Sequence, residues 1–138
     1  MVYGDDFKDK TALEDMNYDC FKTLFMAMNI VSAKNLILPA TTLTNNCYQE
    51  MFLYCTSLIE APKLQSTTLA NYCYYSMFNG CNKLNYIKCL AIDTGTYFTT
   101  DWVSGVSSVG TFVKHPNTTW STGINGIPSG WTIENAEL

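Results

Sequence analysis

Six cysteines, one histidine and two adjacent carboxylate pairs are the residues of this sequence most able to do chemistry. The cysteines occupy positions 20, 47, 55, 73, 81 and 89 of the 138-residue chain. Thiolates and imidazoles are the usual ligands of zinc, and zinc motifs commonly contain two cysteines separated by two residues. Because no such pair is present and His115 is the single histidine, the sequence predicts no metal site.

Disulfide bonds are the second chemistry open to these cysteines. Cys47 and Cys55 are eight residues apart, as are Cys73 and Cys81, in stretches whose pattern is typical of a helix. A rise of about 1.5 Å per residue separates each pair by about 12 Å, which is too far for a disulfide. Equivalent cysteines of neighbouring repeats, such as Cys47 and Cys73, are the alternative partners. The favoured interpretation is that the cysteines are buried thiols that pack as small hydrophobic side chains.

The same inventory argues against catalysis. His115 lies beside a proline in a segment expected to be a loop, and the carboxylate pairs Asp5–Asp6 and Glu14–Asp15 lie in a polar stretch expected to be solvated. A general base needs a nucleophile or a second titrating group within hydrogen-bond reach. The sequence also contains no glycine-rich phosphate loop and no nucleophile elbow. We therefore predict a protein that is not an enzyme and has no cofactor.

Composition limits the classes of partner. Hydrophobic residues make up 47% of the chain and charged residues 14%, which is enough for the core of one domain. The net charge is −4, and the eight lysines and arginines are scattered, so we expect no nucleic-acid partner. No apolar run is long enough for a transmembrane segment, and the first residues are charged where a signal peptide is apolar. The chain is then either cytoplasmic or a segment of a longer exported protein.

An internal repeat organises the sequence. The string from Leu43 to Leu58 recurs 26 residues later from Leu69 to Leu84. A period of about 20 to 29 residues with leucines at fixed places indicates a leucine-rich-repeat solenoid. Residues 20–31 match the same spacing as a degenerate first coil. The positions that repeat form a predicted structural ladder, which consists of Cys47, Tyr48, Met51, Phe52, Cys55, Leu58, Cys73, Tyr74, Met77, Phe78, Cys81 and Leu84.

The ladder spacing predicts a short helix in each coil. Apolar residues fall at i, i+1, i+4, i+5 and i+8, which lie on one face of a helix. Asn45 and Asn71 stand where helix caps are expected, and Gly80 where a helix would end. The stretches 58–62 and 84–90 alternate with period two and predict strands that pair in a parallel sheet. The predicted fold class is α/β, a leucine-rich-repeat solenoid with one short helix and one short parallel strand per coil of about 26 residues.

The last third of the chain has a different composition. Residues 91–138 hold all three tryptophans and six of the eight glycines. We expect a short helix at 99–104 and strands at 110–114 and 131–134. Because a solenoid exposes apolar cross-sections at its ends, this segment is predicted to be its cap. The predicted organisation is a lead-in over 1–19, leucine-rich repeats over 20–90 and a C-terminal α/β cap over 91–138.

The repeat strings resemble the BspA-like leucine-rich repeats of surface proteins from gut anaerobic bacteria. The resemblance rests on residues 38–43 and 71–84, which follow the pattern LPATTLxxxCYxxMFxGCxxL, and on the flanking segments 3–7, 110–114 and 126–131. Gln65 and Tyr54 depart from this pattern, because they replace its proline and glycine. The resemblance implies an exported, extracellular, cell-surface protein without enzymatic activity, which binds host or bacterial proteins. It also implies that this chain is part of something longer.

Positions that differ between the repeats are the best candidates for a binding surface. Tyr54, Tyr72 and Tyr75 fall at such positions and are expected on the outer face of the predicted helices, although they could instead cover one another. The strand side offers Tyr86 and Lys88. Three functions are left open: adhesion to a protein partner, carbohydrate binding by exposed aromatic rings including Trp120, and a structural end-cap of a longer repeat protein.

Overall fold

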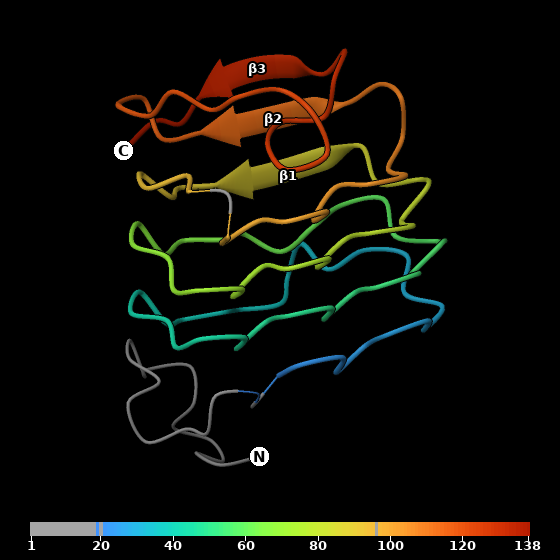
Figure 1. Ribbon diagram of the computed structural model, residues 1–138. Helices are drawn as coiled ribbons and strands as arrows, with labels where there is room; N and C mark the ends of the chain where they lie inside the picture. Colours follow the sequence, from blue (N-terminus) through green and yellow to red (C-terminus); the bar gives the residue numbers. More distant parts are fainter. Residues whose placement is uncertain (1–18, 20, 96) are drawn as a thin grey trace.

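The computed structural model describes residues 19, 21–95 and 97–138 as a stack of coils (Figure 1). Three strands form one parallel sheet in the order β1 (Tyr86–Cys89), β2 (Thr111–Lys114) and β3 (Thr132–Asn135). Within this part of the chain there is no helix. The predicted fold class, in which each coil combines a helix with a strand, is therefore wrong. Of the predicted lead-in, the structure describes only Asp19. Both carboxylate pairs and the cysteine at position 20 lie outside the described residues.

Ribbons of consecutive β-turns stand where the helices were expected. Along residues 44–55, alternate backbone amides bond within the coil to the carbonyl three residues earlier, as from Met51 to Tyr48 at 3.2 Å. The amides between them bond to the next coil instead, as from Phe52 to the Met77 carbonyl at 3.0 Å. An α-helix would use every amide for a bond to the carbonyl four residues earlier. The coil is thus held by its neighbours rather than by its own hydrogen bonds.

The backbone of the turn ribbons repeats every four residues, and this period explains why the sequence pattern predicted helices. Positive φ angles recur at every fourth residue, as at Asn46, Glu50 and Tyr54, which are the third residues of every second turn. That is the position where a type II turn requires positive φ. Over nine residues, an apolar pattern with period four is nearly the same as one with the helical period of 3.6. The pattern therefore predicted the buried face correctly but not the backbone that carries it.

Within the described ranges, four turn ribbons are stacked, at residues 21–27, 46–54, 72–80 and 97–104. The amides of one ribbon bond to the carbonyls of the next, as from Gly80 to Ser104 at 2.8 Å. The helix expected at 99–104 is thus also a turn ribbon. Ribbon and sheet continue from the repeats into residues 91–138, so that the change in composition does not interrupt the stack (Figure 1).

The observed strands agree with their predicted positions more closely than the turn ribbons agree with the predicted helices. β1 lies within the expected stretch 84–90, β2 within 110–114, and β3 is displaced by one residue from 131–134. The stretch 58–62 forms no strand and contributes only parallel bridges from Glu60 to Ser32 and Tyr86. Pro62 has no amide to continue this pairing.

Stacked aromatic rings run through the core. Tyr48, Tyr74, Trp102 and Trp120 form one column, with consecutive ring centroids 6.2, 6.1 and 5.5 Å apart. A second column continues from Phe52 to Phe78 and then to Trp102, where the two columns meet. All twelve residues of the predicted ladder are buried. Burial of this ladder is the main hydrophobic contribution to the stability of the coils.

The five described cysteines are free thiols, and all are buried. Cys55 donates to the Phe25 carbonyl, and Cys81 to the Phe52 carbonyl, both at 3.0 Å. Burial raises the pKa of Cys73, Cys81 and Cys89 to about 12. This agrees with the interpretation of these cysteines as small hydrophobic side chains.

Candidate binding surface

Three tyrosines at the start of the turn ribbons form a continuous cluster. The Tyr72 ring meets the Tyr75 ring at 6.1 Å with an interplanar angle of 70°, and the Tyr97 ring at 6.3 Å and 72°. Tyr72 is 42% exposed and Tyr97 is 67% exposed, whereas Tyr75 is half-buried between ribbon and solvent. We call Tyr72, Tyr75 and Tyr97 the tyrosine cluster.

The backbone holds the cluster in place. The Tyr72 amide donates to the Tyr97 carbonyl at 2.9 Å, and the Tyr75 amide donates to the Tyr72 carbonyl at 3.1 Å. Tyr72 has a φ of 56°, one of the positive values that recur at every fourth residue of the ribbon, and its side chain is exposed. Rings that are fixed before binding lose little conformational entropy when a partner covers them.

The preceding coil carries Asn45, Asn46 and Gln49 at the ribbon positions that match Asn71, Tyr72 and Tyr75. The Asn45 side chain accepts from the Asn71 amide at 3.1 Å, and the backbone amide of Asn46 donates to the Asn71 carbonyl at 3.0 Å. Gln49 lies in the ribbon position below Tyr75 by the 26-residue offset. Tyrosine and asparagine together give large rigid contact area with adaptable hydrogen bonding, as in antibody binding sites.

Sequence comparison of the repeats identified two members of this cluster and missed Tyr97. Tyr97 follows the interruption of the repeat string, so no matching position in an earlier coil pointed to it. The offset of about 26 residues from Asn71 and Tyr72 was the only available signal.

Tyr54 does not belong to the cluster. It is 58% exposed, but it lies at the other end of its ribbon, where its ring covers Gly80. A Cβ added to Gly80 would meet carbon atoms of the Tyr54 ring, so glycine at 80 is what makes room for tyrosine at 54. Tyr54 therefore lies at a site separate from the tyrosine cluster.

The outer sheet face carries the strand-side candidates. Tyr86 is 37% exposed and Lys88 is half-buried on the same face of β1. Glu60 lies beside Tyr86, accepts from the Ser32 hydroxyl at 3.1 Å and pairs with Lys34 at 3.6 Å. Lys34 is exposed and Glu60 is partly exposed, so this solvent-accessible ion pair contributes little stability. As far as the structure describes this face, it is mixed in charge and has no cluster of rings.

Trp120 and His115 are both buried. Trp120 is only 8% exposed and stacks on Trp102 with an interplanar angle of 16°. Its ring is therefore part of the core and cannot serve as a platform for a sugar. His115 was expected in a solvated loop, but it is buried, and its Nδ1 accepts from the Asn117 amide at 3.2 Å. No group of three potential metal ligands occurs among the residues that the structure describes.

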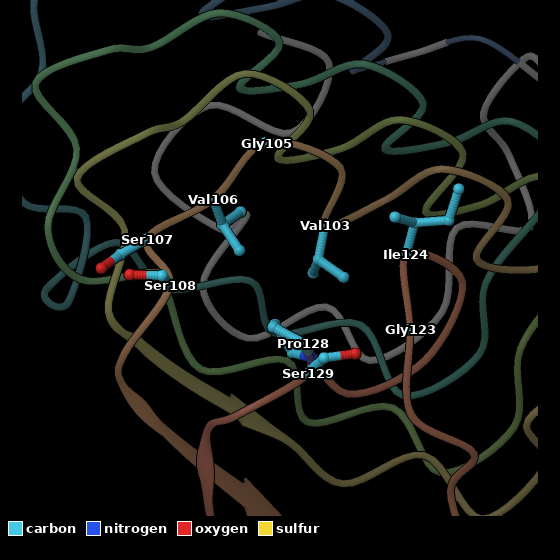
Figure 2. Close-up of a pocket in the computed structure, with 9 residues that line it drawn as sticks. All are labelled: Val103, Gly105, Val106, Ser107, Ser108, Gly123, Ile124, Pro128 and Ser129. Atoms are coloured by element: carbon cyan, nitrogen blue, oxygen red, sulfur yellow. The ribbon is translucent and has the colours of Figure 1, made fainter.

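A pocket of about 190 Å³ opens at the opposite end of the fourth ribbon (Figure 2). Val103 and Val106 point toward the turn at Pro128 and Ser129, while Gly105 contributes bare backbone.

Comparisons with protein-family models, with curated proteins and with solved structures give no match to this chain. Over the described ranges, no helix is long and apolar enough to cross a membrane.

Proposed function

We propose that this protein is a non-enzymatic binding module that recognises a protein partner through the tyrosine cluster. The observation that supports this proposal most is the edge-to-face contact of Tyr72 with Tyr75 and Tyr97 on a backbone fixed by inter-coil hydrogen bonds. Exposed tyrosines in a rigid arrangement are the residues that dominate many protein interfaces.

The angles between the rings favour a protein over a carbohydrate. A sugar ring stacks on the flat face of an aromatic ring, and an extended glycan needs successive faces that point the same way. The Tyr72 ring is inclined by 70° and 72° to its two neighbours, so the three faces do not form one plane. Ring edges and hydroxyls of mixed direction suit the uneven surface of a protein. Carbohydrate binding is the alternative that the experiment below must exclude.

The cellular setting belongs to the same proposal. The repeat strings at 38–43 and 71–84 resemble those of BspA-like surface proteins. We place this chain in an extracellular, cell-surface protein, where its partner is a protein of the host or of another bacterium.

A paired array distinguishes the candidate functions. The purified chain is applied to extracellular-matrix proteins and to glycans, and each signal is repeated with Tyr72→Ala. The proposal predicts a signal on at least one protein that Tyr72→Ala abolishes. A glycan signal that Tyr72→Ala abolishes would replace it with carbohydrate binding. No signal on either array would reject binding and favour a structural end-cap.

A further inference from the structure

One amide at the end of the turn ladder has no hydrogen-bond partner among the described residues. The last amides of the earlier ribbons all donate to the next coil: Ala27 to Leu53 at 2.7 Å, Tyr54 to Asn79 at 2.8 Å and Gly80 to Ser104 at 2.8 Å. Gly105 is the next residue of this column, because a Cβ on Gly105 would lie 3.6 Å from the Gly80 Cα. In each earlier coil, the next coil supplies a carbonyl that accepts from the amide at this position. The Gly105 amide has no such acceptor among the described residues.

The chain above Gly105 does not form a fifth ribbon. Instead, Val103 donates to the Ile124 carbonyl at 3.2 Å, and the Asp101 amide donates to the Asn125 side chain at 2.7 Å. A tight loop follows, in which the Gly123 amide donates to the Ile127 carbonyl at 2.8 Å. The loop covers the first part of the fourth ribbon and stops before Gly105.

The uncovered end is the pocket of Figure 2. Its apolar lining residues are Val103, Val106, Ile124 and Pro128, and Ser107, Ser108, Ser129 and the backbone of Gly105 and Gly123 complete the lining. Its volume of about 190 Å³ is below the roughly 300–1,000 Å³ of pockets for whole drug-sized ligands. That space suits one side chain and the peptide groups next to it.

We propose that this pocket binds a short peptide segment of a partner, with one aliphatic side chain between Val103, Val106 and Pro128. A carbonyl of the segment accepts from the Gly105 amide and so supplies the missing rung. Addition of a segment to an unpaired backbone edge is an established mode of peptide recognition, in which the backbone gives affinity and side-chain pockets give specificity. The site lies at the other end of the ribbon from the tyrosine cluster, and the inference does not depend on the function proposed above.

Nuclear magnetic resonance titration of the nitrogen-15-labelled full chain tests the inference. The probes are acetyl-Gly-Val-Gly-amide and acetyl-Gly-Gly-Gly-amide at millimolar concentration. The valine peptide is expected to shift the Gly105 amide resonance saturably, while the Gly80 amide, which is already paired, does not move. The triglycine peptide should bind about tenfold more weakly, the factor expected when one aliphatic side chain is no longer withdrawn from water.

Two variants control for nonspecific binding. Val106→Asp places a charge in the pocket and should abolish the shift, whereas Val109→Asp changes an exposed valine outside the pocket and should preserve it. If Val106→Asp does not fold, Ile124→Asp, at an exposed position of the pocket wall, replaces it. Absence of a saturable shift at Gly105, equal affinity for the two peptides, or equal loss with Val109→Asp would each overturn the proposal.

Discussion

Tyr72 and Tyr97 are joined twice, through a backbone hydrogen bond of 2.9 Å from the Tyr72 amide to the Tyr97 carbonyl and through an edge-to-face ring contact at 6.3 Å. The bond belongs to the ladder that stacks the coils, and the contact belongs to the exposed surface. The same pairing that stabilises the fold therefore fixes the geometry of the candidate binding surface.

Substitution in the core should cost far more than substitution in the tyrosine cluster. Phe78→Ala removes a fully buried ring that stacks on Phe52 and contacts Trp102 at a tilt of 49°, and should lower the free energy of unfolding by about 3–5 kcal/mol. Tyr75→Ala removes a half-buried ring on the outside and should change it by about 0.5 kcal/mol or less. Urea denaturation of both variants measures the difference, and equal losses would show that this inside and outside assignment is wrong.

Gly80 should be intolerant of alanine for two separable reasons. Its φ of 77° is costly for a residue with a Cβ, by about 1–2 kcal/mol, and that Cβ would also meet the Tyr54 ring. Gly80→Ala should therefore destabilise the protein by about 2 kcal/mol or more. In the double variant Gly80→Ala/Tyr54→Ala only the φ cost remains, so part of the stability should return.

Thermal or urea unfolding of the four proteins in this cycle gives the coupling between positions 54 and 80. Strictly additive effects would mean that the Tyr54 ring does not occupy the space above Gly80.

The buried thiols should be unreactive while the protein is folded. The pKa values of Cys73, Cys81 and Cys89 are raised from 9.0 to about 12 because burial disfavours the thiolate. Between pH 9 and pH 12 these thiols are deprotonated in the unfolded chain but still protonated in the folded protein. The free energy of unfolding should therefore keep its full value below pH 9 and decrease as the pH rises toward 12.

Mass spectrometry after iodoacetamide treatment at pH 8 measures this protection. Cys47, Cys55, Cys73, Cys81 and Cys89 should remain unmodified in the native protein and react in denaturant. Rapid native alkylation of Cys73 or Cys89 would show that the ladder opens far more often than its burial implies.

The sequence allowed the core to be predicted much better than the backbone. Identities between the repeats picked out Met51, Met77 and their neighbours because burial restricts residue type at the same place in every coil. Helix and turn ribbon both put these residues on one face, and they differ in hydrogen bonding that a pattern of nine residues does not reveal. Glu50 and Tyr54 gave no warning of positive φ, since glycine, the usual signal, appears among the described positive-φ positions of the ribbons only at 80 and 105.

The surface was predictable only where the repeat extends. Tyr72 and Tyr75 were found as positions that vary between two matched coils. Tyr97 and Trp120 follow the last matched string, so their exposure could not be deduced by comparison. Trp120 is buried because the stack continues above Trp102, and that continuation depends on tertiary contacts.

The central claim is that the tyrosine cluster binds a protein, and one matched titration tests it most directly. Tyr97→Ala removes the most exposed ring of the cluster, whereas Tyr54→Ala removes a similarly exposed tyrosine at the other end of a ribbon. Both variants and the unchanged chain are titrated against the matrix protein that gives the strongest array signal. The account predicts that Tyr97→Ala weakens the affinity about tenfold or more while Tyr54→Ala leaves it unchanged. Equal affinity for the Tyr97→Ala variant and the unchanged chain would contradict it.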